Sequence, residues 1–139
     1  MELMIVVTVV GIIAAFAIPN YSKAVNKALA KTMVNDLRVI GVAQEGYKAA
    51  NGNSGDYFYQ GVLGNSTQTQ LNQSLGLSLI SPKGVVYSCK ISMVLPTSTG
   101  YCEADYPGQW TYRISTGIAI NPPWSQITCQ SGTCPTGVP

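Results

Sequence analysis

Apolar side chains fill the start of the chain without the periodicity of an amphipathic helix. From Leu3 to Ile18 no residue is charged, and only Thr8 and Gly11 interrupt the apolar run. A helix that is apolar on every side needs burial on every side, which lipid or a bundle of other helices can supply. As a helix, this run would rise about 24 Å, somewhat less than the roughly 30 Å hydrocarbon core of a membrane. The pattern therefore predicts a short membrane span, a buried core helix or a secretion signal.

Two residues mark the ends of this run, Glu2 in front of it and Pro19 behind it. A secretion signal would have a basic front and an A-x-A cleavage site, and neither is present. A carboxylate at the bilayer centre costs about 2.5–3.5 kcal/mol, and a buried one needs a cationic or hydrogen-bonding partner. No Lys, Arg or His lies within residues 1–22. The partner of Glu2 must then be a terminus, a lipid group or another chain, unless Glu2 merely marks the membrane edge in contact with water.

Beyond Pro19 the apolar residues keep to one face of a helix. They recur at spacings of three and four, at Val25, Leu29, Met33, Leu37 and Ile40, with Tyr47 further along. This spacing predicts a helix that packs one face on a domain, and the helix breakers of residues 51–55 predict its end near Ala50. We expect one long helix over residues 1–50. Pro19 should bend it, and Gly11 should weaken it by about 1 kcal/mol relative to Ala.

The rest of the chain predicts a polar loop followed by short strands. Residues 52–82 are rich in Gly, Ser and Gln, which is typical of a connecting loop. Two tripeptides in this loop, beginning at Asn65 and Asn72, fit the glycosylation pattern, but loop composition explains them equally well. We predict strands at residues 85–95, 101–104, 110–114 and 117–120, a turn at 96–100 and a loop over 124–139. A long helix followed by antiparallel strands indicates an α+β fold.

Composition narrows the classes of function. Charged residues make up 10% of the chain, against roughly 25% in typical soluble domains. The net charge of +2 is too small to indicate nucleic-acid binding by itself. The chain has no His, and it has none of the phosphate-binding, dinucleotide-binding, serine-hydrolase or zinc-protease motifs. We therefore expect neither an enzyme nor a cofactor, metal or small-molecule substrate.

The four cysteines, Cys89, Cys102, Cys129 and Cys134, all lie in the C-terminal half. An even number behind an export-type N-terminus indicates disulfides. Three connectivities are possible, and we favour Cys89–Cys102 and Cys129–Cys134 because each pair brackets a turn-like segment. The alternative is a zinc site of four thiolates, for which neither pair has the C-x2-C spacing.

The N-terminal residues also carry a family resemblance. The residues Glu2-Leu3-Met4-Ile5-Val6-Val7, and then Gly11-Ile12-Ile13-Ala14-Ala15-Phe16-Ala17-Ile18-Pro19-Asn20-Tyr21, resemble the N-terminal segment of type IV pilins. They combine an acid at the head, an uninterrupted apolar length, a glycine within the run and a closing proline. Mature pilins begin with a methylated Phe, then Thr, Leu, a variable apolar residue and the glutamate. Met1 matches the variable position, so either three further residues would precede it in the mature protein or the start of this chain departs from the family pattern.

The resemblance, which covers residues 1–21, implies an architecture. Residues 1–21 would form the transmembrane and filament-core segment, and residues 22–51 the amphipathic half of the helix that packs on the head. Residues 52–139 would form the head, with antiparallel strands over about 84–120 and a disulfide-closed C-terminal loop. Glu2, Gly11 and Pro19 would be the residues of assembly, and the segment between Gly11 and Pro19 would lose helical structure in the filament.

The function implied by the resemblance is that of a major pilin, the structural subunit of a type IV pilus-like filament for adhesion, twitching motility or DNA uptake. It would lie in the bacterial inner membrane before assembly and in an extracellular filament afterwards. Its partners would be identical subunits, the prepilin peptidase and the pilus assembly machinery. Glu2 would pair with the N-terminal amine of an adjacent subunit, because an unpaired buried carboxylate is costly. The alternatives are a pseudopilin of a type II secretion system and, from another class, a single-span membrane-anchored binding module.

Five charged residues outside the apolar run need an interpretation. Lys23, Lys27 and Lys31 form a basic stripe, which is either a solvated face just outside the membrane or a partner for acids of neighbouring subunits. DNA binding by this stripe has the least support. Some secretion pseudopilins bind calcium in the head, so the resemblance makes Glu103 and Asp105 candidates to share a cation. Two carboxylates are few beside the six to eight oxygens that calcium takes, and a pair of solvated loop acids is the simpler expectation.

Overall fold

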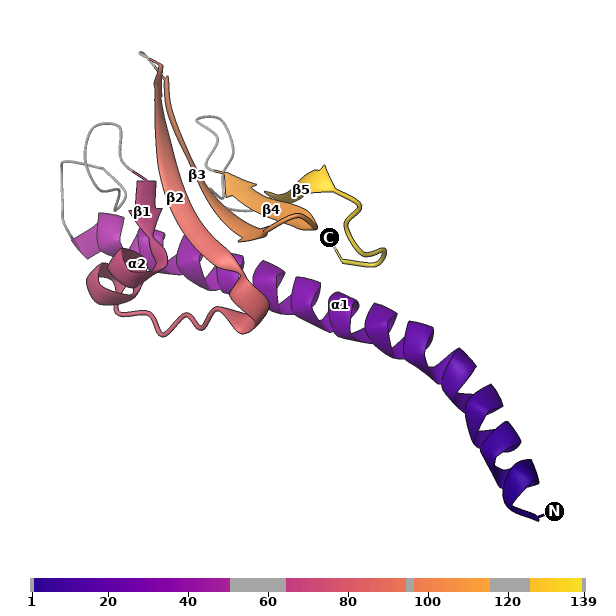
Figure 1. Cartoon of the computed structure of the whole chain (residues 1–139). Coiled ribbons are helices and arrows are strands. Elements are labelled where there is room, and N and C mark those ends of the chain that lie inside the picture. Colours follow the sequence, from indigo (N-terminus) through magenta and orange to yellow (C-terminus); the bar gives the residue numbers. More distant parts are fainter. Residues whose placement is uncertain (1, 51–64, 95–96, 116–125, 139) are drawn as a thin grey trace.

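A long helix and an antiparallel sheet make up the structure. The computed structural model describes residues 2–50, 65–94, 97–115 and 126–138, and Figure 1 shows the sheet lying across the C-terminal half of the helix. The elements in chain order are α1 Glu2–Ala50, β1 Asn65–Thr67, α2 Gln68–Leu75, the 3-10 turn η2 Pro82–Gly84, β2 Val86–Val94, β3 Thr97–Tyr106, β4 Trp110–Ser115 and β5 Gln126–Gly132. The predicted α+β class is confirmed.

The helix α1 runs from Glu2 to Ala50 without a break, with Pro19 inside it. Pro19 has no N–H group, so the carbonyl of Ala15 lacks its helical donor and the helix can open there. Figure 1 shows that α1 curves over its N-terminal half, the half that contains Pro19. The predicted single helix is confirmed, and the predicted bend takes the form of a gradual curve.

The core lies between the C-terminal half of α1 and the inner face of the sheet. Helix α1 contributes six buried apolar side chains to it: Leu29, Ala30, Met33, Val34, Leu37 and Ile40. Four of these belong to the predicted stripe, whereas Val25 and Tyr47 of that stripe are half-buried. Ala30 and Val34, which the prediction omitted, widen the stripe into a face that several strands can cover.

The five strands pair in chain order, and every neighbouring pair is antiparallel. Alternate side chains face the core, as the two-residue period of a strand requires. The buried residues in the sheet and just before it are Val85, Tyr87, Cys89, Cys102, Ala104, Trp110, Tyr112 and Ile114. The strands predicted at 85–95, 101–104 and 110–114 are thus confirmed as β2, β3 and β4.

The predicted loop over residues 52–82 is wrong for its second half. Strand β1 pairs with β2 there, and α2 follows it directly. The N–H of Thr67 donates to Gln70 Oε1 at 2.8 Å, which caps the start of α2, and Leu71 is fully buried beneath it. The spacing of Thr67 and Gln70 was a readable capping signal that the polar composition concealed. The Asn72 side chain bonds both backbone groups of Leu79, at 2.9 and 3.1 Å, which leaves it poorly placed to carry a glycan.

Two further predictions about the sheet need correction. Thr97–Gly100, predicted as part of a turn, belong to β3 and pair with residues 91–94 of β2. Gln126–Gly132, predicted as loop, form β5 and pair with β4. This segment has no alternating pattern because its side chains are mostly exposed at the edge of the sheet. The strand predicted at 117–120 lies outside the described residues.

Candidate functional site

The candidate site is the apolar segment of α1 from Leu3 to Tyr21. Helix α1 is long and apolar enough to cross a membrane, and its most apolar window, with a mean hydropathy of 2.4, has nothing buried. The large apolar side chains between Leu3 and Ile18 are exposed by amounts that range from 49% at Val9 to 80% at Met4. A core helix of a soluble protein would be covered by its own chain. This segment is suited to association with a membrane or with another apolar partner.

Burial of the exposed apolar side chains would contribute a large favourable free energy. Eleven large apolar side chains lie exposed between Leu3 and Ile18. Full burial of one such side chain stabilises by about 1.5–3 kcal/mol, so burial of them all amounts to roughly 15–30 kcal/mol. That is larger than the 5–15 kcal/mol that typically stabilises a whole domain. The apolar surface therefore strongly favours association with a membrane or with another apolar partner over exposure to water.

The polar side chain within the apolar segment has a hydrogen-bond partner in the helix itself. The Thr8 hydroxyl donates to the Met4 carbonyl at 2.8 Å, so this polar group is satisfied within the helix and does not oppose burial in an apolar environment. Gly11 is the other interruption, and a Cβ atom placed there would meet nothing within 4 Å. Nothing in the described chain requires a glycine at this position.

Glu2 and Pro19 lie at the two ends of the apolar run in space as in sequence. Helix α1 begins at Glu2, where the helix dipole favours a carboxylate. The Glu2 side chain itself lies outside the described part of the structure. Glu2, Gly11 and Pro19 are spread along the helix and do not converge on one site. The candidate site is an extended surface and has no pocket-like geometry.

A buried hydrogen bond ties the head to α1. The Tyr87 hydroxyl, on β2, donates to Asp36 Oδ2 of α1 at 2.6 Å. Burial raises the pKa of Tyr87 well above its usual range, and the hydrogen bond to Asp36 and the Asp36 charge raise it further. The phenol therefore remains protonated and donating throughout the physiological range. No local pattern indicates this pair, because the two residues lie 51 positions apart.

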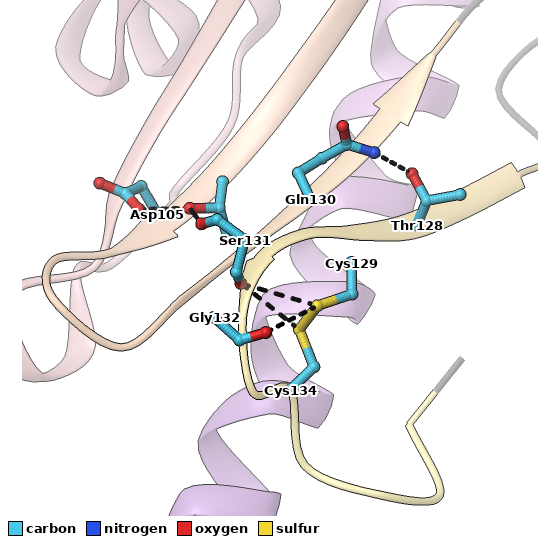
Figure 2. The surroundings of a disulfide bond; sticks show 8 residues. Asp105, Thr128, Cys129, Gln130, Ser131, Gly132 and Cys134 are labelled. Atoms are coloured by element: carbon cyan, nitrogen blue, oxygen red, sulfur yellow. Dashed lines mark hydrogen bonds between the residues drawn. A yellow bond between two sulfur atoms is a disulfide. The ribbon is translucent and has the colours of Figure 1, made fainter.

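The predicted disulfide pairing is confirmed for all four cysteines. Cys89 and Cys102 lie directly opposite each other on β2 and β3, and both are fully buried against α1. Cys129 pairs with Cys134 at the end of β5 (Figure 2). The described residues contain no cluster of side chains that could hold a metal, so the zinc alternative is wrong for the four thiols.

The second disulfide fastens the C-terminal tail to the edge of the sheet. After Cys134 the tail returns to α1, where Val138 packs partly against the core and Gly137 lies beside the Lys27 amine. At the start of this return, Gly132 has φ of 75°, and a Cβ there would lie 1.8 Å from the carbonyl oxygen of Gln109. Only glycine fits this position. Gly132 and the Cys129–Cys134 disulfide thus together connect β5, the tail and the helix.

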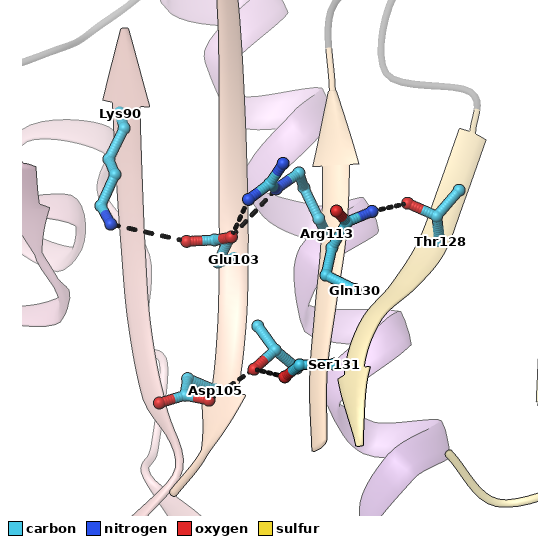
Figure 3. Close-up of polar contacts among 8 residues, drawn as sticks. Lys90, Glu103, Asp105, Arg113, Thr128, Gln130 and Ser131 are labelled. Atoms are coloured by element: carbon cyan, nitrogen blue, oxygen red, sulfur yellow. Dashed lines mark hydrogen bonds and ion pairs between the residues drawn. The ribbon is translucent and has the colours of Figure 1, made fainter. Parts of the chain in front are cut away.

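The two candidate cation ligands of the head have separate partners. Arg113 donates to Glu103 Oε1 from two nitrogens, at 2.9 and 2.6 Å, and the Lys90 amine lies 3.7 Å from the other oxygen (Figure 3). Asp105 Oδ1 accepts from the Thr111 hydroxyl at 2.6 Å. These contacts cross β2, β3 and β4 on the outer face of the sheet. The expectation of a pair of solvated loop acids is wrong, because Glu103 and Asp105 both lie within β3 and each is held by side chains of the neighbouring strands.

The three lysines of the basic stripe, Lys23, Lys27 and Lys31, are all exposed on α1. Their stripe begins two residues after Tyr21, where the apolar segment ends. Both ion pairs seen in the described part of the chain involve Glu103, and none involves this stripe. The stripe is therefore an exposed basic surface next to the apolar one, and it has no ion-pair partner within the described residues.

Comparisons with protein families, with curated proteins and with solved structures find no match for this chain.

Proposed function

We propose that this protein is the structural subunit of a type IV pilus-like filament, which polymerises through the apolar segment of α1. The observation that carries the proposal is the exposure of that segment on all sides, at the free end of a helix whose other half carries the head. The sequence from Glu2 to Tyr21, which resembles type IV pilins, supports it further.

The apolar segment then has two environments in succession. Before assembly it lies in the bacterial inner membrane, where lipid covers it. On extraction the same surface must be covered again, and the equivalent helices of other subunits supply this burial in the core of the filament. The roughly 15–30 kcal/mol available from its large side chains makes either environment far better than water. Gly11, which has open space around it, allows a neighbouring helix to approach closely.

Glu2 sets the register between subunits in this proposal. In a lipid-free core, an unpaired carboxylate costs several kcal/mol, so subunits pack in the one offset that gives Glu2 a cation. Within the apolar segment there is no basic side chain, and the first lysine is Lys23. The resemblance to type IV pilins makes the N-terminal amine of a neighbouring subunit the expected partner.

The head forms the outer surface of the filament. Its two disulfides and its ion pairs on the outer sheet face suit an oxidising, extracellular setting. Loops of the head would contact surfaces and give the filament its adhesive function. The prepilin peptidase and the assembly machinery would act on the chain before this stage.

Substitution of Glu2 separates the filament subunit from a single-span membrane-anchored binding module. In cells that express the chain, Glu2→Gln keeps the size of the side chain and removes its charge, whereas Glu2→Asp keeps the charge. We expect Glu2→Gln to insert into the membrane normally and to leave no filaments in sheared surface preparations, and Glu2→Asp to retain part of the assembly. An anchored module would keep its location and function in both variants. Filaments of normal abundance with Glu2→Gln would refute the proposed role of this residue.

A further inference from the structure

The basic stripe of Lys23, Lys27 and Lys31 lies where the apolar segment of α1 meets water. The three side chains are exposed and follow each other at four-residue intervals on one side of the helix. Tyr21, which is 74% exposed, stands just before them. Tyrosine at the end of a span is typical of the membrane–water interface. The stripe therefore lies at the height of the lipid headgroups in the membrane stage of the proposed function, on which this inference rests.

The apolar run is too short to match a membrane without help. Its helical length of about 24 Å leaves roughly 6 Å of a 30 Å hydrocarbon core to be made up. Short spans adapt by local thinning of the bilayer and by flanking side chains that extend their charged ends to the interface. Lys23 is the first basic residue after the run, so it is the side chain drawn closest to the headgroups.

The stripe also lies on the side of the membrane where basic residues are disfavoured. Lysines next to a span usually remain on the cytoplasmic side. The same side of this span carries two disulfides, which require an oxidising compartment. Lysines on the exported side oppose the usual orientation of a membrane span, so a role on that side would account for their presence there.

Acids of this protein are poor partners for the stripe. The chain has six Asp and Glu residues in all, and Glu2 is reserved for assembly while Asp56 lies outside the described residues. Each of the other four has a partner: Asp36 accepts from Tyr87, Glu103 pairs with Arg113, Asp105 accepts from Thr111, and Glu45 is engaged in a contact of its own. A second copy of the chain therefore offers no free described carboxylate to the lysines. Within the described residues no carboxylate is left over for the lysines, which favours a complementary charge from outside the protein.

We propose that Lys23 and Lys27, with a smaller part from Lys31, bind the phosphate groups of anionic phospholipids at the membrane surface. The three amines differ in their distance from the interface. Counted from Tyr21 at 1.5 Å per residue, the positions lie about 3, 9 and 15 Å along the helix. At physiological salt the Debye length is about 8 Å, so the attraction falls steeply from Lys23 to Lys31. The proposal thus predicts a graded series of effects.

The test uses the full chain reconstituted in vesicles of phosphatidylcholine and phosphatidylglycerol. Spin-labelled forms of the two lipids report, by electron spin resonance, how strongly each associates with the protein. A lysine at the membrane surface should raise the preference for phosphatidylglycerol about fivefold, and salt screening reduces this effect with distance from the surface. For the three lysines together, the wild-type chain should prefer phosphatidylglycerol about sevenfold. Lys23→Gln should reduce this preference to about twofold and Lys27→Gln to about fourfold, while Lys31→Gln stays close to wild type.

Arg38→Gln is the matched control, because Arg38 is an exposed cation on the same helix about 25 Å beyond Tyr21. It removes the same charge and should leave the lipid preference unchanged. If the wild-type chain immobilised both lipids equally, the lipid-binding proposal would be overturned. The membrane stage of the proposed function would still stand. Equal losses from Lys23→Gln and Arg38→Gln would also overturn it, since the effect would then follow net charge alone. If the chain immobilised neither lipid, the membrane stage of the proposed function would fail as well.

Discussion

Removal of the Tyr87 hydroxyl tests what holds the head to α1. Tyr87 is fully buried, and its hydroxyl donates to the Asp36 carboxylate at 2.6 Å. A hydrogen bond to a charged group contributes about 1.5–3 kcal/mol. Asp36 is half-buried, so water can replace part of the lost bond. We therefore expect Tyr87→Phe to lower the free energy of unfolding by about 1.5 kcal/mol at pH 7, the lower end of that range.

Tyr112→Phe is the matched control for this variant. Tyr112 is equally buried in β4, but its hydroxyl has no hydrogen-bond partner among the described residues. Its removal should change the free energy of unfolding by less than about 0.5 kcal/mol. The assay is urea unfolding of the full chain in detergent micelles, followed by the fluorescence of Trp110, which is buried in the head. Equal costs for the two variants would refute the claim that the bond to Asp36 fixes the head on the helix.

The same variant has a signature in the pH dependence. Burial and the Asp36 contact raise the pKa of Tyr87 in the folded chain, whereas the unfolded chain keeps a value of about 10. Above pH 10 the unfolded state loses the phenol proton while the folded state retains it, so the free energy of unfolding falls as pH rises. For one such group the loss is about 1 kcal/mol between pH 10 and 11, and its slope approaches about 1.4 kcal/mol per pH unit at higher pH. Burial also raises the pKa of Tyr112, so we expect Tyr87→Phe to remove only its own share of this loss between pH 10 and 11. An unchanged slope would contradict this assignment.

Three further predictions concern glycines and disulfides. Gly132→Ala places a methyl group against the Gln109 carbonyl and should destabilise the head by at least about 2 kcal/mol in urea unfolding, whereas Gly108→Ala, at a glycine with open space, should cost only about 1 kcal/mol of backbone strain. Replacement of Cys89 and Cys102 together by Ala opens a loop with a separation of 13 residues. It should lower the free energy of unfolding by about 3 kcal/mol or more, because the cavity that is left adds to the loss of the cross-link. A chain as stable as wild type by the same assay would contradict the buried position of this bridge. Gly11→Leu should leave the isolated chain at least as stable as wild type, because nothing lies near Gly11 and Leu is the better helix former, and yet it should reduce filament yield in sheared preparations. Normal yield would mean that no helix approaches there.

The parts of the fold that follow local patterns were predictable from the sequence. The stripe from Leu29 to Ile40 repeats with the helical period, and its burial follows from that period alone. The disulfide of Cys89 with Cys102 was predictable because the two residues flank a hairpin, which brings them opposite each other on adjacent strands. In both cases the information lies within a few residues of the element concerned.

Other features depend on contacts between distant residues, and local patterns could not supply them. Strand β5 has only Ile127 as an apolar anchor, and its strand conformation comes from pairing with β4. The bond of Tyr87 to Asp36 exists because the sheet crosses α1 at one angle and position, which no spacing in the sequence encodes. Gly132 needs its positive φ only because the chain passes over the Gln109 carbonyl. For the candidate site, the sequence predicted the apolar segment itself, and the structure adds that no part of the described chain covers it.

The central claim is that the apolar segment of α1 leaves lipid and is buried among copies of itself. The most direct measurement is electron microscopy of filaments sheared from cells that express the chain, with mass spectrometry of the purified filaments. The account predicts that this chain is the principal component of the filaments, with its disulfides intact. Filaments that lack the chain, while the chain remains wholly in the membrane fraction, would contradict it.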